Sequence, residues 1–277
     1  MQAKVNSIMA GIDRTRRITF EEQADRYDAT ALTYPAALID DIVRLSGVTA
    51  GGRILEIGCG SGQATISFAE RGFTITAVEL GARLAQLAAQ KLCDFPNVQV
   101  IQHEFESWEL PAQPFELVIS AEAFHWIVPE IGIPKVAHAL IPGGMVALFW
   151  SVTERLNTPL HQAIASAYAE IAPDWVNPLA SEVDADFIQR SISAFFERVG
   201  GFEPLQSRFY PACVTASING EVHLEELRTF SAHREMPDST RQALYAAVAA
   251  AFQAHEDRLE QSIGYLLLHT HPLPESA

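Results

Sequence analysis

The stretch RILEIGCGSG, residues 53–62, decides how the chain folds. Its first half is mostly apolar, which predicts a buried parallel strand over Arg53–Ile57. Glycine then occupies every second position, at Gly58, Gly60 and Gly62, and a helical pattern follows. A turn without Cβ atoms lets a ligand approach the backbone, and the start of a helix presents free N–H groups. The stretch therefore predicts a ligand-binding turn between a strand and a helix.

Strands and helices alternate along the chain around this turn. Apolar runs predict further strands over 74–78, 98–102, 117–120 and 145–150, and helical periodicity appears over 35–45, 63–71, 82–92 and 134–140. Beyond Trp150, helices are expected over 159–171, 184–199, 222–230 and 240–255, with strands over 202–215 and 262–269. The pattern predicts a Rossmann-like, doubly wound α/β fold with a mostly parallel, seven-stranded sheet, helices on both faces and helical lid insertions.

Composition narrows the classes of function. The formal net charge of −15 repels phosphate backbones, which argues against a nucleic-acid partner. The apolar runs are too short to cross a bilayer, and the first residues lack the apolar region of a secretory signal, so we expect no membrane partner and a cytoplasmic location. The three cysteines lie far apart and fit neither a disulfide framework nor a metal site.

The glycine spacing favours one class of ligand. A dinucleotide fingerprint that starts at Gly58 needs its third glycine at position 63, whereas the third glycine is Gly62. Glu56 lies two residues before the first glycine and offers a partner for a cationic group. S-adenosylmethionine carries an ammonium and a sulfonium and no phosphate, so it fits this turn better than a pyrophosphate does. The alternative for Glu56 is an ion pair with a nearby base such as Arg53 or Arg83.

Candidate ligand-contacting residues also follow the next three predicted strands. Glu79 can accept hydrogen bonds from ribose hydroxyls, and Leu80 beside it can pack on an adenine. Glu104 can accept from the adenine amino group, and Phe105 offers an apolar face or its backbone N–H. Ala121 lies in the segment SAEAFHW that follows the fourth strand. The carboxyl ends of parallel strands are where open α/β sheets bind ligands, although a solvated carboxylate is the alternative for both acids.

These segments together resemble a known family. Residues 54–62 resemble motif I of the class I S-adenosylmethionine-dependent methyltransferases, E/D-x-G-x-G-x-G, and LIPGG, residues 140–144, resembles their L-x-P-G-G turn. Glu79 stands in the place of the ribose-binding acid, and Glu104-Phe105 in that of the adenine-contacting pair, usually Asp-Ala. The AFHW segment is similar to a subgroup that includes trans-aconitate-methyltransferase-like small-molecule enzymes. The resemblance implies cofactor contacts by Glu56, Gly58, Cys59, Gly60, Gly62, Glu79, Leu80, Glu104, Phe105 and Ala121.

His125 is the candidate catalytic residue. Histidine titrates near neutral pH and suits a base that takes a proton from a hydroxyl or an amine. It stands between Phe124 and Trp126, so a role in shaping the pocket wall is the alternative. A carboxylate acceptor would need a cation instead of a base, for which the candidates are Arg155, Arg190 and Arg208.

The sequence thus predicts an S-adenosylmethionine-dependent methyltransferase that acts on an oxygen or nitrogen atom of a small molecule. We expect a single domain over 1–277, with an N-terminal leader and cap (1–35), a cofactor-binding core (36–150), and lid helices and final strands at the acceptor pocket (151–277). No metal is expected, and the chain is expected to be a monomer or homodimer. The alternatives are an NAD(P)-dependent oxidoreductase and a non-catalytic S-adenosylmethionine-binding protein.

Overall fold

The computed structural model describes residues 33–154, 156–175, 177, 185–229, 233 and 235–274. Its strands are β1 (Arg53–Ile57), β2 (Thr74–Glu79), β3 (Val98–Gln102), β4 (Phe115–Ala121), β5 (Leu140–Glu154), β6 (Gln206–Ile218) and β7 (Leu259–Thr270). The described helices are α3 (Ala36–Ser46), α4 (Gln63–Ala69), α5 (Ala82–Lys91), α6 (Pro129–Ala139), α7 (Pro159–Ile171), α8 (Ala185–Val199), α9 (Gly220–Thr229) and α11 (Asp238–Ala254), and η2 (Phe124–Trp126) is a short 3-10 turn. The leader predicted for the N-terminus, except for its last residues, and the candidate Arg155 lie outside the described residues.

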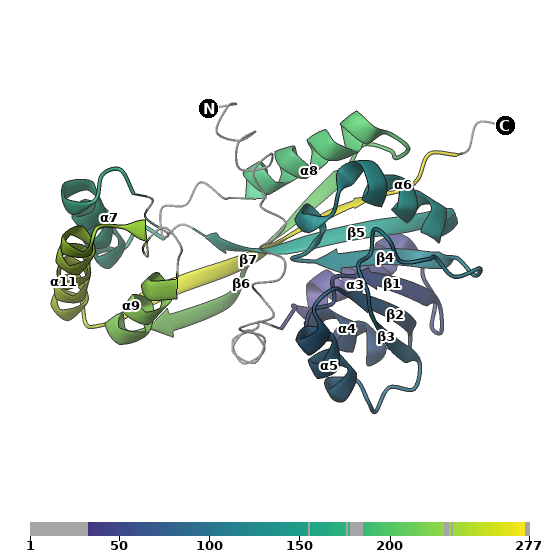
Figure 1. The fold of residues 1–277 in the computed structure, drawn as a ribbon, viewed down its shortest axis with the longest axis horizontal. Coiled ribbons are helices and arrows are strands. Elements are labelled where there is room, and N and C mark those ends of the chain that lie inside the picture. Colours follow the sequence, from purple (N-terminus) through teal and green to yellow (C-terminus); the bar gives the residue numbers. More distant parts are fainter. Residues whose placement is uncertain are drawn as a thin grey trace. The chain divides into compact units, whose positions relative to one another are not determined.

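One mostly parallel sheet joins the described strands in the order β3-β2-β1-β4-β5-β7-β6 (Figure 1). β1 pairs in parallel with β2 on one side and with β4 on the other, so that Ile54 lies beside both Ile75 and Leu117. These central residues are fully or almost fully buried. The Rossmann-like α/β fold that the sequence predicts is therefore confirmed.

The order of the strands creates a crevice at the end of β1. The chain builds outward from β1 to β2 and β3, and then returns to the other side of β1 to form β4 and β5. Right-handed crossovers in opposite directions place α4 and α5 on one face of the sheet and α6 on the other, as Figure 1 shows. The loops that follow β1 and β4 lie at this switch point, where open α/β sheets bind ligands.

The helices of this region bury one face each. In α3, Leu38, Ile39 and Ile42 are fully buried, and the helix ends at Gly47, whose left-handed φ of 66° lets its N–H donate to the carbonyl of Val43. In α5, the buried positions Leu84, Ala85 and Ala88 likewise lie on one helical face, and these residues stack the helix against β2 and β3.

Among the predicted boundaries that differ in the structure, two have a local cause. The helix expected from Pro134 begins at Pro129, because a proline fits the first helical position, where its missing N–H removes no hydrogen bond, and Pro134 then lies inside the helix. The expected turn at residues 142–144 lies within β5, where the register against β4 shifts between Phe115 and Leu117 and Gly143 has a φ of 78°. The turn residues therefore bulge out of a longer strand.

The chain divides into two compact units. One contains Met1–Trp150, Ile188–Phe209 and Leu266–Ala277, and the other contains Ser151–Phe187 and Tyr210–Tyr265. The second unit has its own core, in which α7, α9 and α11 bury side chains such as Ile164, Leu227 and Leu244. In the part of the chain that the structure describes, no helix has the length and apolar character needed to cross a membrane.

Candidate functional site

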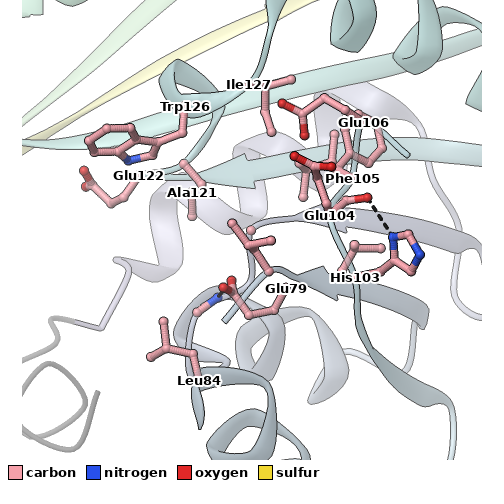
Figure 2. Close-up of a pocket in the computed structure, with 16 residues that line it drawn as sticks. Glu79, Leu84, His103, Glu104, Phe105, Glu106, Ala121, Glu122, Trp126 and Ile127 are labelled. Carbon is pink, nitrogen blue, oxygen red and sulfur yellow. Dashed lines mark hydrogen bonds between the residues drawn. The ribbon is translucent and has the colours of Figure 1, made fainter. Parts of the chain in front are cut away.

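A cavity opens at the carboxyl ends of β1, β2, β3 and β4 in the first unit, and Figure 2 labels side chains from the ends of β2, β3 and β4 around it. Seven residues that the sequence singled out line it: Gly58, Gly60, Glu79, Leu80, Glu104, Phe105 and Ala121. Four others do not line it: Glu56, Cys59, Gly62 and His125. The fold thus brings together four segments that are spread over more than sixty residues of the sequence.

The glycine turn has a backbone that only glycine adopts easily. Gly58, Gly60 and Gly62 have φ angles of 71°, 58° and 90°, all in the left-handed region. A Cβ atom built on Gly58 would lie 2.5 Å from the Cβ of Ala123, in the loop after β4. The turn therefore packs directly against the β4 loop, and any side chain at Gly58 would push the two strand ends apart.

Glu79 closes this turn from the end of β2. Its Oε2 atom accepts a hydrogen bond from the Gly60 N–H at 2.9 Å, and its Oε1 atom accepts one from the Gly81 N–H at 2.8 Å. A carboxylate offers about four lone-pair sites, and these two bonds direct both of its oxygens at backbone N–H groups. The carboxylate is thus fixed in place where it lines the cavity.

Glu56 lies beneath the turn and is fully buried. Its Oε2 atom accepts a hydrogen bond from the Thr65 hydroxyl of α4 at 2.6 Å, while its Oε1 atom has no hydrogen-bond partner among the described residues. Burial raises the pKa of Glu56 to about 7, the Thr65 hydroxyl opposes this rise, and the nearby Glu79 adds to it. The basic partners considered for it bond elsewhere: the Arg53 side chain donates to backbone carbonyls of 113–114, and Arg83 donates to Gln86.

The segment after β3 forms the opposite wall of the cavity. Phe105 is buried, with the Lys135 ammonium 5.3 Å from the centre of its ring. Glu104 has its side chain near Ser107, whose hydroxyl donates to Glu104 Oε2 at 3.1 Å, and its carbonyl lies 2.9 Å from His103 Nδ1 (Figure 2). The wall therefore combines an apolar ring with a carboxylate, as a contact with an adenine base and its amino group would require.

One hydrogen bond determines which ring nitrogen of His125 carries the proton. The Trp150 indole N–H, which can only donate, lies 3.2 Å from His125 Nδ1, so Nδ1 is the acceptor and the neutral ring carries its proton on Nε2. Burial lowers the pKa of His125 to about 4. The free ring nitrogen is therefore a hydrogen-bond donor near neutral pH. This argues against the predicted role of His125 as a base, which stays a prediction.

The cavity also contains residues that were not predicted as cofactor contacts, although the segment SAEAFHW already included Glu122, Ala123 and Trp126. These additional lining residues are Ile57, Val78, Leu84, His103, Glu106, Glu122, Ala123, Trp126 and Ile127. Glu122 has an unusual backbone conformation for a residue other than glycine, with a left-handed φ of 57°. Its N–H donates to the Phe149 carbonyl of β5 at 2.9 Å. The signal that could have found most of these residues is their position after strand ends already recognised, whereas Ile57, Val78 and Leu84 lie within β1, β2 and α5.

Of the arginines considered for a carboxylate acceptor, the two that the structure describes, Arg190 and Arg208, do not line the cavity. Arg208 forms an ion pair with Asp41 of α3, and Arg155 lies outside the described residues. Among the described residues, no group of three or more His, Cys, Asp or Glu side chains is placed to hold a metal ion.

Sequence comparison matches residues 54–144 to a family described as a methyltransferase domain. An uncharacterized methyltransferase of Mycobacterium bovis is 28% identical over 141 residues, which are 51% of this chain and 55% of that protein. A malonyl-[acyl-carrier protein] O-methyltransferase of Paenibacillus is 32% identical over 123 residues, 42% of this chain and 44% of that protein. The chain thus spans about half the length of the curated relatives it matches.

Solved structures share the fold. A proposed type II methyltransferase from Anaeromyxobacter dehalogenans aligns with a TM-score of 0.58 and 21% identity, covering 88% of this chain and 99% of that one. A phosphoethanolamine N-methyltransferase from Haemonchus contortus aligns with a TM-score of 0.51 and 13% identity, covering 94% of this chain and 60% of that one. The sequence match supports the predicted resemblance to the class I S-adenosylmethionine-dependent methyltransferases, the solved structures add the shared fold alone, and the trans-aconitate-like subgroup stays a prediction.

Proposed function

We propose that this relative of the class I methyltransferases transfers a methyl group from S-adenosylmethionine to an oxygen or nitrogen atom of a small molecule. The observation that carries the proposal is the position of Glu79, whose carboxylate is tied to the glycine turn by the Gly60 N–H and lines the cavity at the switch point of the sheet. A carboxylate held there matches the paired hydroxyl groups of a ribose, and no phosphate needs to be accommodated.

The residues present fit this cofactor along the whole cavity. Gly58 presents bare backbone to the ligand, and Glu79 would accept hydrogen bonds from the ribose hydroxyls. Leu80 and Phe105 would pack on the adenine, with Glu104 beside its amino group. When bound, S-adenosylmethionine would supply a methyl group that its sulfonium already activates.

The remaining task of the protein is to position the acceptor. Holding an acceptor atom in line with the methyl group contributes on the order of 7–11 kcal/mol without any acid or base. With its Nε2 proton, His125 suits a hydrogen bond to an acceptor oxygen or a carbonyl more than proton removal. An acceptor that loses a proton before it enters the site, such as a neutral amine or a carboxylate, would then need no base from the protein.

The partners and location follow from the same reasoning. We propose a small-molecule acceptor, no nucleic-acid or membrane partner, a cytoplasmic location, and a monomer or homodimer. The net charge of −15 supports the exclusion of nucleic acid, since the field around the protein repels phosphate.

A ligand comparison tests the proposal. Thermal unfolding of the full chain would be followed with S-adenosylhomocysteine and, separately, with NAD at matched concentrations. We expect a rise in Tm with S-adenosylhomocysteine alone, because a ligand that binds the native state stabilises it. A rise with NAD alone would favour the oxidoreductase alternative, and binding of S-adenosylmethionine without methyl transfer to a broad acceptor panel would favour the non-catalytic one.

A further inference from the structure

Glu56 is a buried acid with a single hydrogen-bond donor among the described residues. Its side chain is fully buried beneath the glycine turn, and the Thr65 hydroxyl of α4 donates to one of its oxygens. The other oxygen, Oε1, is buried without a hydrogen-bond partner among the described residues. A carboxylate removed from water normally needs several donors or a cation, so this environment favours the neutral carboxylic acid.

The titratable groups around Glu56 also favour its neutral, protonated form. From β2, Glu79 faces it, and two backbone N–H groups stabilise the charged form of that carboxylate. From the turn itself comes the Cys59 thiol, whose pKa burial raises well above its ordinary value, with Glu56 and Glu79 adding to the rise. On β4, the residue paired with Glu56 is Ile119, which does not titrate. Two acids thus lie close together, and the one with two backbone N–H donors is better suited to hold the charge than the one with a single hydroxyl donor.

We propose that Glu56 carries a proton while the cavity is empty and releases it when the positively charged cofactor binds. The inference rests on the proposed function, because the positive charge is that of S-adenosylmethionine. In this step the Glu56 O–H bond breaks, the proton passes to the solvent, and the carboxylate stays beneath the glycine turn, from where its charge acts on the ligand without contacting it. Glu79 keeps its hydrogen bonds to Gly60 and Gly81 throughout, and the Cys59 thiol keeps its proton.

The proposal gives the site a pH dependence with a defined sign. Burial raises the pKa of Glu56 to about 7 in the empty site, so cofactor binding has to remove a proton below that pH and removes none well above it. The affinity for S-adenosylmethionine should therefore increase as the pH rises towards neutrality, by up to about tenfold for each pH unit, and then level off. Acidification would return the proton to Glu56 and weaken the hold on the cofactor.

Calorimetry on the full chain measures the proton directly. S-adenosylmethionine is titrated into the wild type and into Glu56→Gln at about pH 6 and about pH 9, each in two buffers that differ in ionisation enthalpy. We expect the wild type to release close to one proton more than Glu56→Gln at the lower pH and the two to agree at the higher pH. Comparing the variants cancels proton changes on the amino group of the ligand itself. Glu104→Gln is the matched control, since it removes a cavity carboxylate with a solvent-facing environment and should leave the proton release in place.

The outcomes separate this inference from the proposed function. Failure of S-adenosylmethionine and S-adenosylhomocysteine to bind at any pH would remove the proposed function. Binding with the same proton release in the wild type and Glu56→Gln would overturn the role of Glu56 and leave the proposed function intact.

A second variant keeps the test available if Glu56→Gln does not fold. Thr65→Val removes the hydroxyl that stabilises the charged Glu56, with little change in shape. The proton release of Thr65→Val should persist to a higher pH than that of the wild type, because the pKa of Glu56 rises further. An unshifted release would contradict the proposal.

Discussion

The Gly60 backbone N–H lies 2.9 Å from Glu79 Oε2, so the last side chain of β2 holds the turn that follows β1. The N–H of Gly81, two residues after Glu79, donates to the second oxygen of the same carboxylate. The two strand ends are therefore joined by a side chain as well as by the sheet, and the ligand-facing backbone is held in shape before any ligand arrives.

Glu79→Ala should weaken the binding of S-adenosylhomocysteine far more than His125→Ala does. The loss of hydrogen bonds to a carboxylate corresponds to about 1.5–3 kcal/mol, or about 10- to 100-fold in Kd. Titration calorimetry on both variants measures this. Glu70→Ala, at an exposed position at the end of α4, is the control for the loss of one negative charge. Equal losses in Glu79→Ala and His125→Ala would mean that the ribose lies elsewhere.

Gly58→Ala should lose stability and ligand binding because of a steric clash. The new Cβ would lie 2.5 Å from Ala123 Cβ, in addition to the strain of a φ of 71°. Gly72→Ala is a matched control, since Gly72 has a φ of 81° and nothing within 4 Å of the added atom. Denaturant unfolding should show a loss of about 1–2 kcal/mol from backbone strain in both variants and a further loss in Gly58→Ala alone.

The double variant Gly58→Ala/Ala123→Gly isolates the clash. Removing the Ala123 methyl group takes away the atom that the new Cβ meets, so part of the stability lost in Gly58→Ala should return. Strictly additive losses in the double variant would show that the two strand-end loops do not meet as described.

His125 should make the protein less stable in acid. Its pKa is lowered by burial to about 4, below its ordinary value, so the native state disfavours the charged ring. The stability gained from the neutral ring is present above the unfolded pKa of about 6.5 and is lost as the pH falls towards the folded pKa.

A comparison with His125→Asn isolates this loss. The asparagine amide oxygen can still accept from the Trp150 N–H, but asparagine does not titrate. Denaturant unfolding from neutral pH down to about pH 4 should show the wild type losing up to about 3 kcal/mol relative to the variant. Parallel pH profiles would show that His125 is not held neutral.

A buried polar chain should stabilise the second unit. The Tyr168 hydroxyl lies 2.9 Å from His233 Nε2, and His233 Nδ1 lies 3.2 Å from the Tyr245 hydroxyl. Tyr168 and His233 are buried, so Tyr168→Phe leaves a ring nitrogen without its partner and should cost about 1–3 kcal/mol of unfolding free energy. Tyr245→Phe, at a more exposed position, should cost less, and chemical denaturation of both variants gives the comparison.

The order and type of the elements could be predicted from the sequence because each depends on neighbours within a few residues. The apolar run over Arg53–Ile57, the alternating glycines and the helical pattern after them each carry their own local signal. The position of Glu79 at a strand end is equally local. Helix α6 shows where such local prediction ends. Both Pro129 and Pro134 could begin the helix, and only its packing decides that it begins at Pro129.

The sequence by itself therefore determined the strand–turn–helix order, the parallel sheet and the strand-end residues that face its carboxyl edge, because hydrophobic period and glycine spacing act over short distances. The tertiary structure alone decided the rest. Only the packing of β4 beside β1 brings Ala123 against Gly58, and only β5 beside β4 brings the Trp150 N–H to His125. Partners for a buried group come from strands distant in sequence, so its protonation and chemistry depend on contacts that no local pattern records.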